Sequence, residues 1–198
     1  GGIDFLVPLG TTGETPCLEN DERIKVLEAA KEHSGGLPIL AGGGTNSLQH
    51  TIRSMQMLDP HGVDAFLIVV PYYNKPTQEG QYQYFKAVAE STDKPVVLYN
   101  VPGRTGANMT AETCLRLAEI PNIVAVKEAS GNRPQIEEIL RNAPKDFAVL
   151  KSNQYSAFDT QPLAPGAVRY AALVVYMPES VGNEANHAAN QPAPSINL

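Results

Sequence analysis

One lysine, Lys127, stands at a point in the chain where it could act as a nucleophile. It follows the apolar residues 123–126, which have the composition of a buried β-strand. An ammonium group at the end of such a strand is costly to desolvate, so the pKa of Lys127 should fall. A lysine that is neutral near pH 7 can form a Schiff base with a carbonyl substrate. For a lone lysine, a side chain that extends from the strand end into solvent is the commoner case.

Four further segments favour the chemical role for Lys127. They read Gly-Thr-Thr-Gly-Glu at 10–14, Ala-Gly-Gly-Gly-Thr-Asn at 41–46, Pro-Tyr-Tyr-Asn-Lys-Pro at 71–76 and Tyr-Asn-Val-Pro-Gly-Arg-Thr-Gly at 99–106. In this order, and together with the strand that ends in Lys127, they resemble the pyruvate-dependent class I aldolases of the dihydrodipicolinate synthase and N-acetylneuraminate lyase family. The resemblance covers residues 1–150 and fades after them.

The resemblance implies a mechanism on four residues. Pyruvate would condense with Lys127 to an imine, which loses a methyl proton to give an enamine that attacks an aldehyde. Tyr99 matches the central acid and base of the family, and Thr11 the threonine of its proton relay. Tyr73 matches the tyrosine that completes the relay from a neighbouring subunit, which implies a homo-oligomer, either a dimer or a tetramer. On composition alone, Tyr73 could equally belong to a contact surface.

Two residues are candidates for binding the substrate carboxylates. Thr12 and the loop amides around Gly13 could hold the carboxylate of pyruvate. Arg104 offers a planar fork for a second carboxylate, unless it is an ordinary solvated loop arginine. Because the sialate lyases of the family lack this arginine, the resemblance favours aspartate semialdehyde as second substrate, in lysine and diaminopimelate synthesis. The alternatives are a sialate lyase, a sugar-acid aldolase or a catalytically inactive fragment.

The sequence also departs from the family at several places. Residues 151–154 and 167–170 differ from the turns that normally pack beside pyruvate. His50 stands where lysine-sensitive members carry a glutamate, and Asn20 where they carry a histidine. A site without that carboxylate should hold the amino group of lysine poorly.

Apolar strands alternate with helical segments, as in parallel βα units. One helix would start from a cap at Asn20 or Asp21, bury Ile24, Leu27 and Ala30, and end before Gly35. Strands are predicted at 3–9, 38–41, 65–70, 95–99, 123–127 and 147–150, and further helices at 48–58, 80–90, 111–119, 134–142 and near residue 156.

A doubly wound sheet would fit this alternation almost as well as a barrel. The candidate residues, however, all lie at or just beyond the C-terminal ends of strands, where a (β/α)8 TIM barrel gathers its active site. We therefore predict an α/β fold with a partial (β/α)8 barrel at residues 1–177, whose last strand falls within 168–176. The first βα unit and the C-terminal helices of the family have no match. Residues 178–198 have the composition of a polar, coil-like tail.

Composition narrows the class of protein further. The 198 residues are 42% hydrophobic, enough for one sizeable core. The net charge of -6 argues against a nucleic-acid partner. No apolar run is long enough to span a membrane and no signal peptide opens the chain, which favours a cytoplasmic protein. The two cysteines and four histidines form no metal-binding pattern, so we expect neither a metal nor a cofactor beyond the pyruvate imine.

Overall fold

The computed structural model describes residues 3–151 and 170–171 of the chain. Its strands are β1 (Phe5–Leu6), β2 (Leu40–Gly42), β3 (Ala65–Val69), β4 (Val96–Asn100), β5 (Ile123–Glu128), β6 (Ala148–Lys151) and β7 (Tyr170–Ala171). Its α-helices are α1 (Asn20–His33), α2 (Leu48–Leu58), α3 (Gln78–Glu90), α4 (Pro102–Thr105), α5 (Ala111–Ala118) and α6 (Arg133–Asn142). Three short 3-10 turns lie at Thr11–Gly13, Thr15–Cys17 and Asp59–His61.

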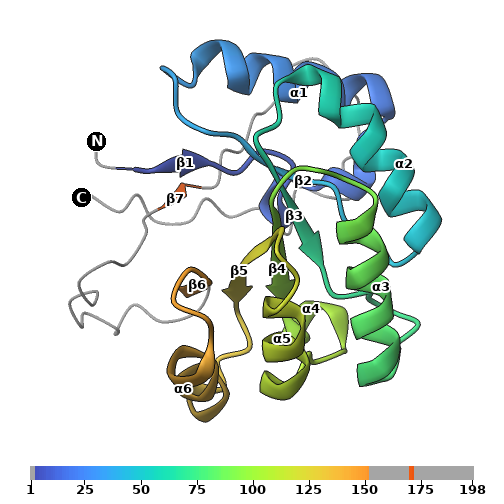
Figure 1. The fold of residues 1–198 in the computed structure, drawn as a ribbon. Coiled ribbons are helices and arrows are strands. Elements are labelled where there is room, and N and C mark those ends of the chain that lie inside the picture. The colour runs from blue at the N-terminus through green and yellow to red at the C-terminus, as the bar shows by residue number, and fades with distance from the viewer. Residues whose placement is uncertain (1–2, 152–169, 172–198) are drawn as a thin grey trace.

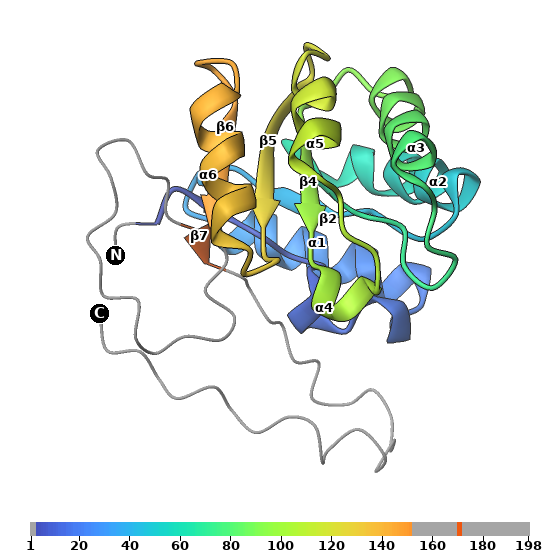
Figure 2. The ribbon, with the colours of Figure 1, turned by 90° about the horizontal axis from the view of Figure 1, so that it is seen from below.

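The strands form a parallel arrangement that continues from one pair to the next. Strands β2 to β6 pair in chain order as one five-stranded parallel sheet. Strand β1 pairs in parallel with β7, and a parallel bridge between Leu6 and Ile39 joins β1 to the β2 side of the sheet. Figures 1 and 2 show this run of strands with the helices packed beside it.

The helices cover only one face of the sheet, which is the arrangement of a barrel. The larger apolar cluster combines helical residues such as Leu27, Phe85 and Leu117 with the outward side chains of the strands. The smaller cluster contains side chains from the strands and their loops, with no residue of α1 to α6. A doubly wound sheet would carry helices on both faces. The described residues therefore favour the barrel over the alternative.

Side chains alternate between these two faces along β4 and β5, as the pleat of a strand requires. Val97 and Tyr99 belong to the strand-only cluster, whereas Val96 and Leu98 face the helices. Tyr99 pairs in register with Lys127, so both side chains emerge at the same level from neighbouring strands. The sheet thus brings together the two residues that the sequence placed at the ends of separate strands.

Helix boundaries follow local capping chemistry more than apolar periodicity. The cap predicted at Asn20 or Asp21 is wrong, because Glu19 caps α1 through a capping box with Glu22. Ile24 is only partly buried, while Val26, Leu27 and Ala30 form the packed face. The helix expected at 48–58 is confirmed as α2. Helices α2, α3, α5 and α6 each begin with a polar cap that accepts a backbone N–H three residues later: Ser47, Thr77, Thr110 and Asn132.

Other expectations either changed or lie outside the described residues. The strand predicted at 3–9 is shorter, because only Phe5–Leu6 is a strand and Leu9 adopts a φ of 58°. Within 168–176, the structure describes the strand β7 alone. The helix near residue 156 and the tail at 178–198 fall outside the described residues. Among the described residues, no helix is long and apolar enough to cross a membrane.

Candidate active site

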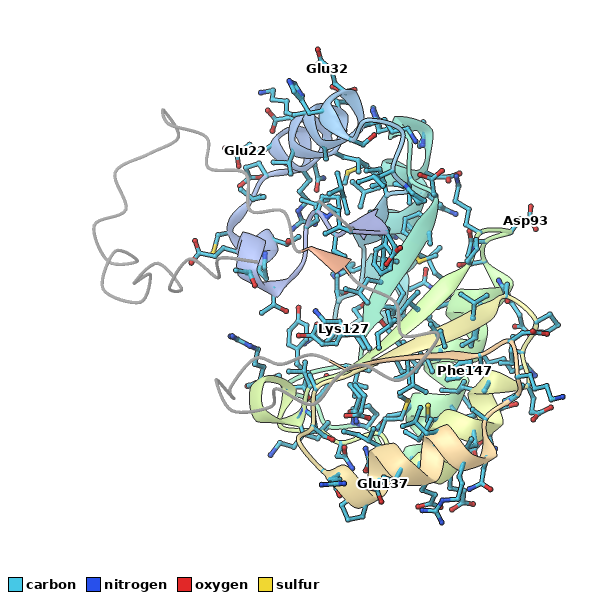
Figure 3. All side chains as sticks on the ribbon, turned by 90° about the vertical axis from the view of Figure 1, so that its left-hand side faces the viewer. Glu22, Glu32, Asp93, Lys127, Glu137 and Phe147 are labelled. Carbon is cyan, nitrogen blue, oxygen red and sulfur yellow. The ribbon has the colours of Figure 1, made fainter. Side chains whose placement is uncertain are left out.

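Lys127 ends the apolar part of β5 and is buried in the strand-only side of the sheet. Only 8% of the residue is exposed. Figure 3 shows it near the middle of the molecule, whereas Glu32 and Asp93 lie at the outside. Burial, followed by the positive charge of Arg104, lowers the pKa of Lys127 from 10.5 to about 8. The effect predicted from the sequence is therefore present in the structure.

This pKa changes how often Lys127 can act as a nucleophile. At pH 7 a lysine with a pKa of about 8 is neutral in about one molecule in ten. A lysine with the ordinary pKa of 10.5 is neutral in about one molecule in three thousand. Because only the neutral amine attacks a carbonyl, the lowered pKa makes Lys127 far more available as a nucleophile near neutral pH.

Tyr99 lies directly beside Lys127 and is itself buried. The Nζ atom of Lys127 lies 4.4 Å from the centroid of the Tyr99 ring, within the range of a cation–π contact. Tyr99 is 2% exposed, and its hydroxyl has no hydrogen-bond partner among the described residues. Such a hydroxyl is costly to bury unless something completes its hydrogen bonding. It is therefore well placed to exchange hydrogen bonds with a reacting group.

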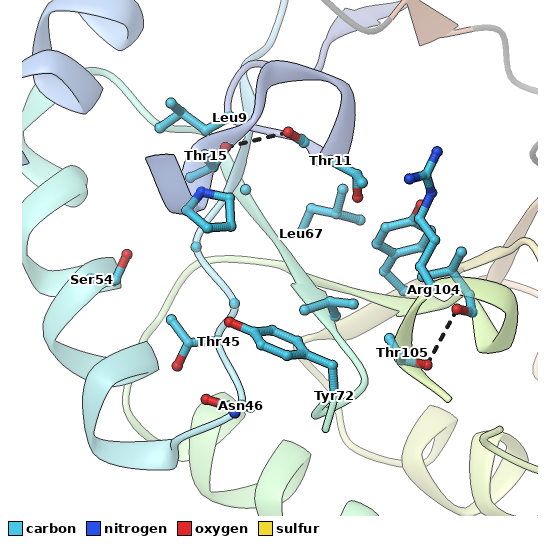
Figure 4. Close-up of a pocket in the computed structure, with 18 of the residues that line it drawn as sticks. Leu9, Thr11, Thr15, Thr45, Asn46, Ser54, Leu67, Tyr72, Arg104 and Thr105 are labelled. Carbon is cyan, nitrogen blue, oxygen red and sulfur yellow. Dashed lines mark hydrogen bonds between the residues drawn. The ribbon is translucent and has the colours of Figure 1, made fainter. Parts of the chain in front are cut away.

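A cavity of about 550 Å³ opens at the C-terminal ends of the strands. Thr11, Tyr99 and Arg104 all line it, together with Thr45 and Tyr72. Figure 4 shows Thr11, Tyr72 and Arg104 arranged around this space. Lys127 does not line the cavity itself. Its amine lies over the ring of Tyr99, and Tyr99 does line the cavity. The volume is in the range of small-molecule sites.

Thr11 is held at the cavity by a tight turn after β1. Thr15 Oγ1 donates to the carbonyl of Gly10 at 3.3 Å, and Gly13 N donates to the same carbonyl at 2.9 Å. The preceding backbone passes very close to Gly42, where a Cβ atom would lie 1.9 Å from the Leu9 carbonyl oxygen. Gly42 is thus required for the close approach that positions Thr11.

Arg104 is presented by α4, a single turn that the sequence analysis did not predict. Its backbone N donates to the Val101 carbonyl at 2.9 Å. The buried hydroxyl of Thr105 donates to the carbonyls of Val101 and Ala107, and Gly106 ends the turn with a φ of 69°. Arg104 itself is exposed at the edge of the cavity, where it can reach a ligand carboxylate.

Two predicted site residues lie apart from this group. Thr12 is exposed and does not line the cavity. Tyr73 is 88% exposed and adopts a φ of 70°, with its backbone N donating to the Thr105 carbonyl at 3.4 Å. Its neighbour Tyr72 faces the cavity instead. Within this single chain, Tyr73 therefore does not meet Lys127.

A hydrogen-bonded group that the sequence did not reveal lies behind Thr45, which lines the cavity. Thr45 Oγ1 lies 3.1 Å from the Thr51 hydroxyl, which lies 2.8 Å from the Tyr84 hydroxyl. Tyr84 also donates to the Thr45 carbonyl at 2.8 Å, and burial raises its pKa to about 12. One feature of the sequence could have revealed this group. Two polar residues, Thr51 and Tyr84, stand on the buried faces of α2 and α3.

The described residues contain no group of three or more His, Cys, Asp or Glu side chains that could hold a metal ion. The two cysteines are both free thiols, Cys17 exposed and Cys114 buried. Burial, followed by the charge of Glu128, raises the pKa of Cys114 to about 12. Neither thiol lines the cavity, whose polar lining includes threonine hydroxyl groups, the guanidinium groups of Arg23 and Arg104, and the imidazole of His50.

Comparison with known proteins points to one family. The model of the dihydrodipicolinate synthetase family matches residues 1–169, which extends past the resemblance seen in the sequence motifs. The 4-hydroxy-tetrahydrodipicolinate synthase of Koribacter versatilis is 54% identical over 169 residues, which are 84% of this chain and 56% of that protein.

Two solved structures extend the comparison to the fold. One is described as a monomeric dihydrodipicolinate synthase variant, with a TM-score of 0.74, 42% identity and coverage of 77% of this chain and 53% of that one. The other is the chloride-inhibited dihydrodipicolinate synthase from Acinetobacter baumannii complexed with pyruvate, with a TM-score of 0.71, 42% identity and coverage of 75% and 52%. The likeness confirms the predicted (β/α)8 barrel. The chain spans about half the length of the proteins it matches.

Proposed function

The chain belongs to the dihydrodipicolinate synthetase family, and on that premise we propose that it joins pyruvate to aspartate semialdehyde through a Schiff base on Lys127. The observation that carries the proposal is the buried amine of Lys127, whose pKa is lowered to about 8 and which lies 4.4 Å from the ring of Tyr99. This activity would place the protein among the lyases of lysine and diaminopimelate biosynthesis. The relative from Koribacter versatilis is named a 4-hydroxy-tetrahydrodipicolinate synthase.

The reaction begins at the amine of Lys127. Its nitrogen attacks the carbonyl carbon of pyruvate, and the carbonyl oxygen leaves as water after taking up two protons. The resulting iminium withdraws electrons, so the methyl group loses a proton and an enamine forms. The enamine carbon attacks the aldehyde carbon, and the aldehyde oxygen takes up a proton. Water then adds to the iminium carbon and the carbon–nitrogen bond breaks, which releases a keto product and returns Lys127 to its free amine.

Tyr99 and Thr11 are the proposed proton relay. Tyr99 carries a buried hydroxyl without a described partner beside the reacting amine, and Thr11 presents its side chain to the same cavity. Tyr73 is exposed, so it would join the relay only from another subunit. We therefore propose a homo-oligomer, a dimer or tetramer, in which Tyr73 of one subunit reaches the cavity of the next.

The carboxylates of the two substrates are assigned to different loops. Thr12 and the amides around Gly13 are proposed to hold the carboxylate of pyruvate, which would require the exposed Thr12 to turn toward the cavity. Arg104 is proposed to hold the carboxylate of aspartate semialdehyde with its planar guanidinium. No specific contact favours a sialate lyase or a sugar-acid aldolase. The covalent imine serves in place of a cofactor, and we propose a cytoplasmic location.

The test is the choice of aldehyde, measured on protein from the complete reading frame. With pyruvate present, kcat/KM is compared for aspartate semialdehyde and neutral sugar aldehydes. Arg104→Ala should lower kcat/KM for aspartate semialdehyde about tenfold or more, since a charge-assisted pair contributes about 1.5–3 kcal/mol. Arg23→Ala is the matched control, because Arg23 lines the same cavity but its Nε already donates to the Leu18 carbonyl at 3.1 Å. Preference for a neutral sugar would sink the synthase proposal.

A further inference from the structure

A buried carboxylate lies behind the reacting residues, on the opposite face of the same two strands. Glu128 is 1% exposed and pairs in register with Asn100, which is fully buried. Its carboxylate accepts hydrogen bonds from Asn100 Nδ2 at 3.0 Å, from Gln135 Nε2 at 3.2 Å and from Ser130 N at 2.8 Å. All three recorded donors are neutral amides. A charge buried in this way needs a specific arrangement of donors to be tolerated.

The donors are themselves connected, so the group forms one network. Asn100 Nδ2 also donates to Asn108 Oδ1 at 2.9 Å, and Asn108 Nδ2 donates to Gln135 Oε1 at 2.9 Å. Met109 N donates to Asn100 Oδ1 at 3.0 Å. We call the side chains of Asn100, Asn108, Glu128 and Gln135 the amide–carboxylate cluster. It joins the end of β4, the end of β5, the loop before α5, and helix α6.

The position of this cluster relates it to the chemistry. Glu128 and Asn100 follow Lys127 and Tyr99 directly, and in each strand successive side chains point to opposite faces. Ala129 N donates to the Asn100 carbonyl at 2.8 Å, so the two strand ends remain paired beyond the reacting residues. Any change in the separation or twist of these strand ends would move the Lys127 amine relative to the Tyr99 ring.

We propose that Glu128 is a positioning residue, whose carboxylate draws the ends of β4 and β5 together through the amide–carboxylate cluster and so keeps Lys127 and Tyr99 in contact and out of water. The effect on turnover rests on the proposed function, whereas the effect on the surroundings of Lys127 does not. Misplacement of a reacting group by about 1 Å can cost about a hundredfold in rate, so such a support matters for catalysis.

An alternative role for Glu128 predicts the opposite sign. If its negative charge acted directly on Lys127, then Glu128→Gln would remove a favourable partner of the ammonium and lower the pKa of Lys127. If Glu128 positions the strand ends, the same change loosens them and admits water around the amine. Because burial is the largest cause of the lowered pKa, hydration should raise it toward its ordinary value.

The experiment measures the pKa of Lys127 without substrate, by competitive labelling with acetic anhydride across pH 6–11 and mass spectrometry of the peptide. Four proteins are compared: wild type, Glu128→Gln, the control Asn122→Ala, and the exchange Glu128→Gln with Gln135→Glu. Asn122 precedes the opposite end of β5, where its Nδ2 donates to the carbonyls of Ala89 at 2.8 Å and Thr92 at 3.0 Å. The control thus removes comparable hydrogen bonds from the same strand.

Glu128→Gln should raise the labelling midpoint of Lys127 by about 0.5 pH unit or more. Asn122→Ala should lower the Tm by a similar amount to Glu128→Gln but leave the labelling midpoint of Lys127 unchanged. The exchange should restore the wild-type midpoint, because a carboxylate at position 135 can accept from Asn108 and from the amide introduced at position 128. In turnover, Glu128→Gln should lower kcat about tenfold with KM for pyruvate changed less than about threefold.

Three results would overturn the positioning role. They are a lower midpoint in Glu128→Gln, an unchanged midpoint in Glu128→Gln, or an equal rise in Asn122→Ala. Failure of the wild type to react with pyruvate would instead contradict the proposed function. The labelling midpoints would still decide whether Glu128 positions Lys127.

Discussion

Replacing Lys127 by methionine should stabilise the folded chain near neutral pH. The amine is 8% exposed, and a pKa that falls from 10.5 to about 8 corresponds to a cost of about 3 kcal/mol for burying the ammonium. The cation–π contact with Tyr99 returns about 1 kcal/mol of this. Methionine has a similar length and no charge to desolvate. Lys127→Met should therefore raise the free energy of unfolding by about 2 kcal/mol at pH 7.

The pH dependence identifies the cause of this gain. Below pH 8 the folded protein must bury the ammonium, so the cost is fully present. As the pH rises through 8 toward 10.5, the folded state loses its proton first and wild type gains stability relative to the variant. Above 10.5 lysine is neutral in both states and the cost disappears. Urea unfolding of wild type and Lys127→Met at pH 7 and at pH 10 measures the difference in their free energies of unfolding. If the variant is no more stable at pH 7, or if its gain in stability is the same at both pH values, Lys127 does not bury an ammonium group.

The remaining predictions concern the neighbours of Lys127 and regulation. Tyr99→Phe should lower kcat by about 10²–10⁴ with little change in KM, whereas unchanged kcat with raised KM would indicate a binding role. Arg104→Ala should raise the labelling midpoint of Lys127, because its positive charge is the second cause of the lowered pKa; a lower midpoint would contradict this. Free lysine should inhibit turnover weakly or not at all up to millimolar levels, given His50 and Asn20, and strong micromolar inhibition would show that other residues supply the missing charge.

The site residues that the sequence identified are those whose position follows from a strand end. Lys127 and Tyr99 each end a run of apolar residues with strand periodicity, and parallel strands bring such ends to one level. The alternation of strands and helices predicted an α/β fold, and the placement of the candidate residues at strand ends favoured the barrel over a doubly wound sheet. Arg104 was found through its loop motif, although the helical turn that presents it was not predicted.

Features that depend on contacts between distant segments were not predictable from the pattern. The amide–carboxylate cluster joins Asn100 to Glu128 across 28 residues of sequence, and Glu128 to Gln135 across 7. Side chains alternate between faces along a strand, so Glu128 lies on the face opposite Lys127, but the sequence does not say which amides meet it there. In the same way, the sequence does not reveal that Tyr73 is exposed, with a φ of 70°, while its neighbour Tyr72 lines the cavity.

Trapping with pyruvate and sodium borohydride tests whether Lys127 forms the imine. Protein from the complete reading frame is incubated with both reagents, digested, and searched by mass spectrometry for the reduced pyruvate adduct. We expect one adduct on Lys127, with a trapping rate that rises with pH up to about 8. Lys127→Arg should form none, because its guanidinium stays protonated. An adduct on Lys151, or no adduct in folded protein, would contradict imine formation by Lys127.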